Sequence, residues 1–177
     1  MMRAAIALGL LALIAGGPAA AQDLMFKATL RGDQAPTMTG SKATGSAKIM
    51  VDVAAQTVDL SVDVAGLKID DLWNQLKTAP IGPIHLHLYG THNHADPNAQ
   101  VTLVFPAPYG TTYSATPAGF KVVMVRFPYA QAAAILKSNV PFNDFVTSLE
   151  SGAVVVNIHT NAQPDGEISG DVVPVKS

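Results

Sequence analysis

The amino-acid sequence predicts one mainly all-β domain over residues 22–177, an antiparallel β-sandwich or barrel of Greek-key type with one to three short helices in its connections. Short apolar segments recur along the chain, and the clearest of them, 58–64, alternates valine and leucine with aspartate and serine. This period of two is typical of a strand with one buried and one wet face. Turn-forming residues separate the segments, and neither an internal repeat nor a domain linker interrupts them.

The first half of the domain is predicted to consist mainly of strands. The segments 46–53 and 58–64 are joined by a short turn and therefore predict an antiparallel hairpin. Asp70 and Asp71 are predicted to begin one or two helical turns, because acidic side chains favour the start of a helix. The predicted elements of this half are strands at 25–30, 46–53 and 58–64 and a short helix at 70–76.

The second half is predicted to mix strands with short helices. Segment 106–119 is rich in proline, glycine and threonine, which indicates a loop. Pro141 is predicted to begin a helix, and the turn at 163–166 separates the last two strands. The predicted elements are strands at 84–89, 101–105, 121–127, 154–159 and 167–173 and helices at 130–137 and 142–149.

Residues 1–21 are predicted to be a secretory signal peptide. Arg3 supplies a positive start, an apolar run spans 4–15, and three alanines at 19–21 offer a small-residue cleavage site before Gln22. The apolar run is shorter than the roughly 20 residues of a membrane-spanning helix. We therefore expect a periplasmic or secreted protein that has no membrane attachment after cleavage.

The composition limits the classes of partner. The sequence has a net charge of −2 and no cysteine, which excludes both a disulfide and a lipid-modified cysteine. It has neither a basic patch for nucleic acid nor a charge run for an anionic membrane surface. We therefore expect no nucleic-acid partner. Packing, aided by a metal ion, is expected to stabilise the domain in place of disulfides, and the oligomeric state stays open.

Four of the five histidines lie within the ten residues from His85 to His94. Residues two apart in a strand share a face, so His85, His87 and Tyr89 point to one side while the aliphatic residues between them point into the core. Such positions are about 6.5–7 Å apart along the strand. Two imidazoles at that spacing can converge on one ion held about 2.0–2.1 Å from each nitrogen.

The fifth histidine, His159, lies far downstream and shares a strand face with Asn157. If the two strands are neighbours, His159 becomes a third ligand, and His92 or His94 supplies a fourth from the loop. Asp96 is a candidate acceptor that fixes a ring tautomer, or a ligand itself. The candidate ligands are therefore His85, His87, His92, His94 and His159, with Asp96, Asn157 and Tyr89 as candidate outer contacts.

The type of the candidate ligands indicates which metal ions the site would prefer. Imidazole suits zinc, copper, iron and nickel, and divalent copper heads the affinity order, so the pattern favours a mononuclear copper site with zinc as the second choice. A histidine must be deprotonated to bind, so we expect the affinity to fall as the pH drops through the range near 6.5. Two alternatives stay open: a metal-free extracytoplasmic interaction module, and a zinc site that only stabilises the fold.

Four segments share the pattern of a known protein family. They are 26–30, the strand 62–67, the His-x-His element at 85–87, and the closing segment 157–170, which is the most specific of the four. With them the chain resembles a CHRD domain, the module named after chordin and found in many bacterial exported proteins. The resemblance covers nearly all of residues 22–177 and implies the fold more firmly than it implies a function.

The order of the candidate ligands is also similar to that of copper–zinc superoxide dismutases. Those proteins are β-sandwiches with a His-x-His pair on one strand, loop histidines with an aspartate, and a late histidine. This likeness of pattern implies redox chemistry such as superoxide dismutation, if one metal position stays open to substrate. The chain lacks a disulfide pair, and Arg126 is the one arginine of its later half. Whether the protein is an enzyme is therefore left open.

Overall fold

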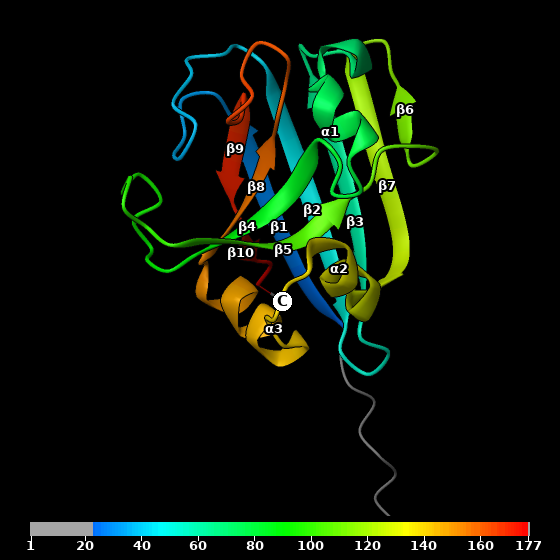
Figure 1. Cartoon of the computed structure of the whole chain (residues 1–177), viewed down its shortest axis with the longest axis vertical. Helices are drawn as coiled ribbons and strands as arrows, with labels where there is room; N and C mark the ends of the chain where they lie inside the picture. The colour runs from blue at the N-terminus through cyan, green and yellow to red at the C-terminus, as the bar shows by residue number, and fades with distance from the viewer. Residues whose placement is uncertain (1–22, 177) are drawn as a thin grey trace, which may run out of the picture.

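The structure, a computed structural model, describes residues 23–176, so the predicted signal peptide at 1–21 lies outside the described residues. Ten strands form one antiparallel sheet that curls into a half-barrel (Figure 1). The predicted fold class, mainly β and antiparallel with a few short helices, is confirmed. The strands are β1 (Leu24–Arg31), β2 (Thr44–Asp52), β3 (Thr57–Ala65), β4 (Ile84–Tyr89), β5 (Val101–Ala107), β6 (Tyr113–Ala115), β7 (Gly119–Pro128), β8 (Val154–Ile158), β9 (Ile168–Asp171) and β10 (Val173–Pro174).

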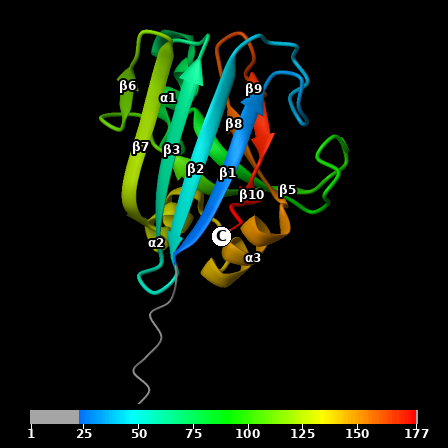
Figure 2. The same ribbon diagram turned by 180° about the vertical axis from the view of Figure 1, so that it is seen from behind.

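The long strands β1, β2, β3 and β7 lie side by side, as the view from behind shows (Figure 2). The predicted hairpin is formed by β2 and β3, in which Ile49 pairs with Leu60 and Asp52 pairs with Thr57. The valine and leucine side chains of 58–64 are buried, and the residues that alternate with them are not. The period of two therefore directs one face of this hairpin into the core.

Strands β4, β5, β8 and β9 cross in front of the long strands at an angle (Figure 1). The strand order is β5-β4-β8-β9-β1-β2-β3-β7-β6, and β10 pairs with β1. Strand β4 therefore lies beside β8, although three strands and two helices separate them in the chain. This long-range pairing brings the histidine-rich strand next to the strand that leads to His159.

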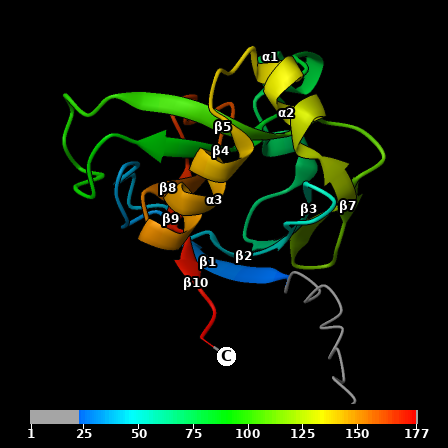
Figure 3. The same cartoon turned by 90° about the horizontal axis from the view of Figure 1, so that it is seen from below.

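Two helices lie together at one end of the half-barrel (Figure 3). They are α2 (Tyr129–Leu136) and α3 (Phe142–Ser151), and Pro141 directly precedes α3, as predicted. The Tyr129 and Phe145 rings stack with their centroids 4.8 Å apart, and Phe145 also stacks on Phe105 of β5. Aromatic packing therefore fixes this end of the core.

The structure differs from the predicted elements in three places. The predicted helix at 70–76 is divided into a 3-10 turn, η1 (Ile69–Asp71), and α1 (Asn74–Thr78), because Leu72 between them is buried and pairs with Thr160 of the final connection. The predicted loop 106–119 contains β6, because the Tyr113 hydroxyl donates to Ala107 O at 2.7 Å and holds this segment on the sheet. The predicted strand 167–173 is divided between β9, which lies between β8 and β1, and β10, which pairs with β1 at Phe26 and Lys27.

Within residues 23–176, no helix has both the length and the apolar character needed to cross a membrane.

Candidate metal centre

Strand β4 divides its side chains between two environments. Ile84 and Leu86 are fully buried in the hydrophobic core. His85, His87 and Tyr89 alternate with them and lie on the opposite, outer face of the sheet. The division predicted from the sequence is therefore confirmed, and the aliphatic residues anchor a strand that presents its histidines away from the core.

Strand β8 places the fifth histidine on the same outer face. Across the β4–β8 ladder His85 is opposite Asn157, and His87 is opposite Val155. His159 follows the last residue of β8, and its backbone N–H donates to Pro83 O at 2.9 Å, which continues the pairing beside β4. The two histidine-bearing segments are therefore neighbours in space.

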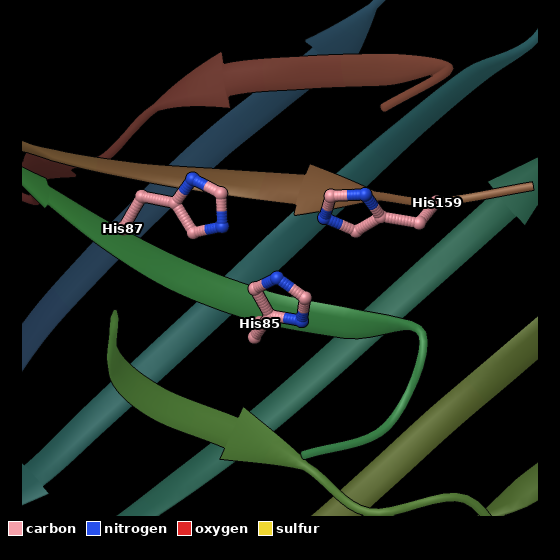
Figure 4. A group of neighbouring side chains, drawn as sticks. All are labelled: His85, His87 and His159. Atoms are coloured by element: carbon pink, nitrogen blue, oxygen red, sulfur yellow. The ribbon is translucent and has the colours of Figure 1, made fainter. Parts of the chain in front are cut away.

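Three imidazoles converge on a common gap. The candidate ligand atoms of His85, His87 and His159 all lie within 4.8 Å of one another. The His85 ring stacks on His159 with centroids 4.4 Å apart and on His87 with centroids 4.8 Å apart. Figure 4 shows a ring nitrogen of each histidine directed toward the gap between the rings. An ion in this gap would meet three nitrogens from two strands.

Two of the rings are held by backbone carbonyls. His85 Nδ1 lies 3.1 Å from Gly82 O, and His159 Nδ1 lies 2.7 Å from Pro164 O. A carbonyl oxygen only accepts, so Nδ1 of each ring donates and Nε2 of the neutral ring keeps its lone pair. The Nε2 atoms of His87 and His159 are buried and make no hydrogen bond to the described residues. Carbonyl acceptors on the far nitrogen are the usual outer partners of metal-binding histidines.

Two glycines allow these carbonyls to reach the rings. Gly82 has φ +73°, and a Cβ on it would lie 1.8 Å from Ala107 O of β5. Gly166 ends the turn that presents Pro164, and a Cβ there would lie 2.3 Å from Asn157 Oδ1. In both turns a side chain has no room, so only glycine permits the observed backbone path.

Comparison with known proteins places the fold in a family. A model of the CHRD domain matches residues 26–172. The chain belongs to the CHRD domain family. No curated protein and no solved structure matches it in two further comparisons. The resemblance seen in the sequence is thereby confirmed for the fold, and the chemistry is argued from the site itself.

The closing segment of this CHRD domain, 157–170, surrounds the site. It contributes His159, the Pro164 carbonyl that holds the His159 ring, and the turn glycine Gly166. Asn157 Nδ2 donates to Asp165 O at 3.2 Å and so ties the turn to β8. The most specific part of the family pattern therefore builds one wall of the histidine cluster.

Burial keeps the three rings of this CHRD domain neutral. Burial, together with repulsion between positive charges on His85 and on the neighbouring His159 and His87 rings, lowers the pKa of His85 to about 2. Burial, with His159, lowers the pKa of His87 to about 4. Burial also lowers the pKa of His159. From the sequence alone, protons were expected to compete with a metal ion for these nitrogens near pH 6.5. The lowered pKa values move this competition to lower pH.

The β4–β5 connection, 90–100, places its two histidines in different environments. His92 is exposed, whereas His94 is buried and only 6 % exposed. Neither belongs to the group of His85, His87 and His159. Asp96 makes no hydrogen bond to a histidine ring among the described residues, and its Oδ1 accepts one from Asn98 N at 2.9 Å within the connection. Tyr89 lies between the cluster and His94, with its ring centroid 6.4 Å from that of His87 and 4.9 Å from that of His94.

Asp171 is a site residue that the sequence reasoning missed. Its Oδ1 lies 2.8 Å from His94 Nδ1. The signal was present in the predicted strand 167–173, because a period of two places Ser169 and Asp171 on one face. In the structure these two residues are opposite Asn157 and Val155, so they lie on the histidine face of the sheet.

The residues of the cluster fit a transition-metal ion. Three nitrogens about 2.0–2.1 Å from one ion are roughly 3.3–3.6 Å from each other. The widest separation in the cluster, 4.8 Å, must therefore shorten by about 1.3 Å for all three nitrogens to bind one ion in this geometry. The donors are three neutral imidazoles, and the His87 residue as a whole is only partly buried.

Proposed function

We propose that this CHRD domain is an exported metal-binding protein whose three clustered histidines hold one copper ion. The observation that carries the proposal is the convergence of three Nε2 atoms, two of them buried and without a partner in the described chain. A buried polar atom without a hydrogen bond costs roughly 1–3 kcal/mol. A bound ion removes this cost by taking up the lone pairs.

A metal-free interaction module explains the cluster less well. With Nδ1–H of His85 and His159 committed to carbonyls, both Nε2 atoms are acceptors and cannot bond to each other. His87 can donate from its own Nε2 to one of them at most. One of these two acceptors then has no partner among the described residues. A cation is the kind of partner that satisfies all three together.

Copper is preferred to zinc on the chemistry of the donor set. The ligands are imidazoles without thiolate, and copper binds such nitrogen sites more tightly than zinc in the divalent affinity series. Copper bound by three nitrogens has positions left for a small ligand and supplies one-electron chemistry. Partial exposure of His87 favours access, so we add redox activity of the superoxide dismutase type as the second part of the proposal. A structural zinc site is the competing assignment.

Metal analysis of protein purified without a polyhistidine tag, followed by titration with Cu²⁺, tests the proposal. We expect one copper per chain and an electron spin resonance spectrum with nitrogen splittings. His85→Ala and His159→Ala are expected to lose tight binding, and His92→Ala is the matched control because His92 is exposed. Zinc uptake without redox activity favours the structural site. Wild-type protein that binds neither metal contradicts the proposal and favours the interaction module.

A further inference from the structure

A fourth imidazole repeats the arrangement of the clustered histidines. His94 is the one fully buried residue of the connection 90–100, and its Nδ1 lies 2.8 Å from Asp171 Oδ1. An ionised carboxylate only accepts, so Nδ1–H donates and Nε2 of the neutral ring keeps its lone pair. This Nε2 is buried and has no hydrogen-bond partner among residues 23–176.

The same hydrogen-bonding arrangement of a histidine ring therefore occurs three times on this face of the sheet. In His85, His159 and His94 alike, an oxygen acceptor fixes Nδ1–H and leaves Nε2 free. Metal-binding histidines typically show this pairing, which fixes the tautomer and raises the basicity of the ligand nitrogen. A carboxylate acceptor raises it more than a carbonyl does, because of its charge. His92, two positions earlier, is exposed and shows no such pairing.

The sheet register places Asp171, the partner of His94, in the same row of residues as His87. Asp171 of β9 is opposite Val155 of β8, and Val155 is opposite His87 of β4. Adjacent strands are about 4.8 Å apart, so Asp171 and His87 stand about 10 Å apart in one row. The His94 ring is held over this row by Asp171 and contacts Tyr89, with ring centroids 4.9 Å apart.

We propose that His94 is the fourth nitrogen ligand of the copper site, carried in by the β4–β5 connection and oriented by Asp171. This inference rests on the proposed function. The connection projects from the sheet (Figure 1) and is closed at its base by a Gly90 N–Gln100 O hydrogen bond of 2.8 Å. The proposal requires the connection to tilt above this bond, with the β4–β5 ladder kept intact and with Asp171 following His94.

The metal itself favours the tilt. His94 Nε2 lacks a partner in the present position and gains one only when it reaches the ion. Such a difference between the two states is what a ligand needs to shift their populations. Four nitrogen donors also suit the tetragonal geometry that divalent copper prefers.

Copper titration and spin resonance of two matched variants test the inference. His94→Gln keeps a donor for Asp171 but removes the imidazole, and His92→Gln makes the same change at the exposed position. We expect His94→Gln to weaken Cu²⁺ binding by at least about 10-fold and to reduce the nitrogen donors in the spectrum from four to three. His92→Gln is expected to match the wild type, and circular dichroism checks that both variants fold.

Asp171→Asn and hydrogen exchange give a second readout. Asp171→Asn is expected to weaken copper binding by about 10-fold, since loss of an outer acceptor typically costs 10–100-fold. Copper is expected to slow amide exchange in residues 90–100 of the wild type and not of His94→Gln. Wild-type affinity and four nitrogens in His94→Gln overturn the inference and leave the three-histidine site standing. Wild-type protein that binds no copper overturns both.

Discussion

The rings of His85 and His159 stack with their centroids 4.4 Å apart, although these residues belong to strands far apart in the sequence. Each ring donates from Nδ1 to a carbonyl on its outer side, so the two Nε2 lone pairs are left on the side of the shared gap. Because both Nε2 atoms are acceptors, neither ring can donate a hydrogen bond to the other. The two rings therefore do not form a hydrogen-bonded pair, and their arrangement is suited to binding an ion between them.

Copper is expected to stabilise the fold. An ion that binds only the folded state adds about 2.7 kcal/mol at a free concentration of 100 Kd. For a domain of this size, this corresponds to a rise in Tm of roughly 5–10 °C. Calorimetry without Cu²⁺ and with Cu²⁺ at a free concentration of 100 Kd measures the rise, and His159→Ala should show none. An equal rise in the variant would show that copper binds elsewhere.

The metal-free protein is expected to lose stability as the pH falls below about 6.5. The unfolded histidines take up protons there, whereas the folded pKa values are lowered, to about 2 for His85 and about 4 for His87. The unfolded state therefore binds more protons, and the free energy of unfolding falls as the pH drops, by up to about 1.4 kcal/mol per histidine and pH unit. Urea unfolding between pH 7 and 4 measures the slope.

A variant of His87 separates the effect of histidine protonation on stability from the effect of carboxylate protonation. His87→Asn removes one titrating ring from the cluster and keeps a polar side chain at the partly buried position. Its free energy of unfolding should depend less steeply on pH than that of the wild type between about 6 and 4. Equal slopes in the two proteins would contradict burial of neutral rings.

Copper is expected to stay bound at pH 5. A proton competes with the ion only where the ring of the folded protein can be protonated, and burial moves the pKa of His87 to about 4 and that of His85 lower still. An exposed histidine site with pKa near 6.5 loses its ion across this range. Equilibrium dialysis at pH 7 and pH 5 compares the two cases, with a histidine-rich peptide as the exposed reference. Release in parallel with the peptide would contradict the expectation.

The period of two in the sequence predicted the elements that carry the site. It placed His85 and His87 on the face opposite Ile84 and Leu86, and it placed Asn157 and His159 on one face of their strand. These assignments follow from local chain geometry alone. The turn at 163–166 was also predicted, and its Gly166 N–Gln163 O hydrogen bond of 3.0 Å confirms it.

Pairing between distant strands could not be predicted in the same way. The β4–β8 neighbourhood was a condition of the histidine hypothesis, because nothing local in 84–89 selects 154–158 as its partner. Asp171 was missed for a related reason. Its meeting with His94 depends on the β8–β9 register and on the path of a loop, and short-range patterns determine neither.

Gly82→Ala is expected to damage both the fold and the site. Gly82 has φ +73°, and the new Cβ would lie 1.8 Å from Ala107 O, so the turn or β5 must shift. We expect a loss of about 3–4 kcal/mol in the free energy of unfolding. Because Gly82 O holds the His85 ring, copper affinity should fall as well.

Gly40→Ala separates the clash from backbone strain. Gly40 has nearly the same φ, +72°, but a Cβ there meets nothing within 4 Å. It should therefore cost only the left-handed strain of about 1–2 kcal/mol and leave copper affinity unchanged. Urea midpoints and copper titrations of both variants measure the two effects. Equal losses of stability would mean that β5 yields freely to the new methyl group. Unchanged copper affinity in Gly82→Ala would contradict the role of the Gly82 carbonyl in holding the His85 ring.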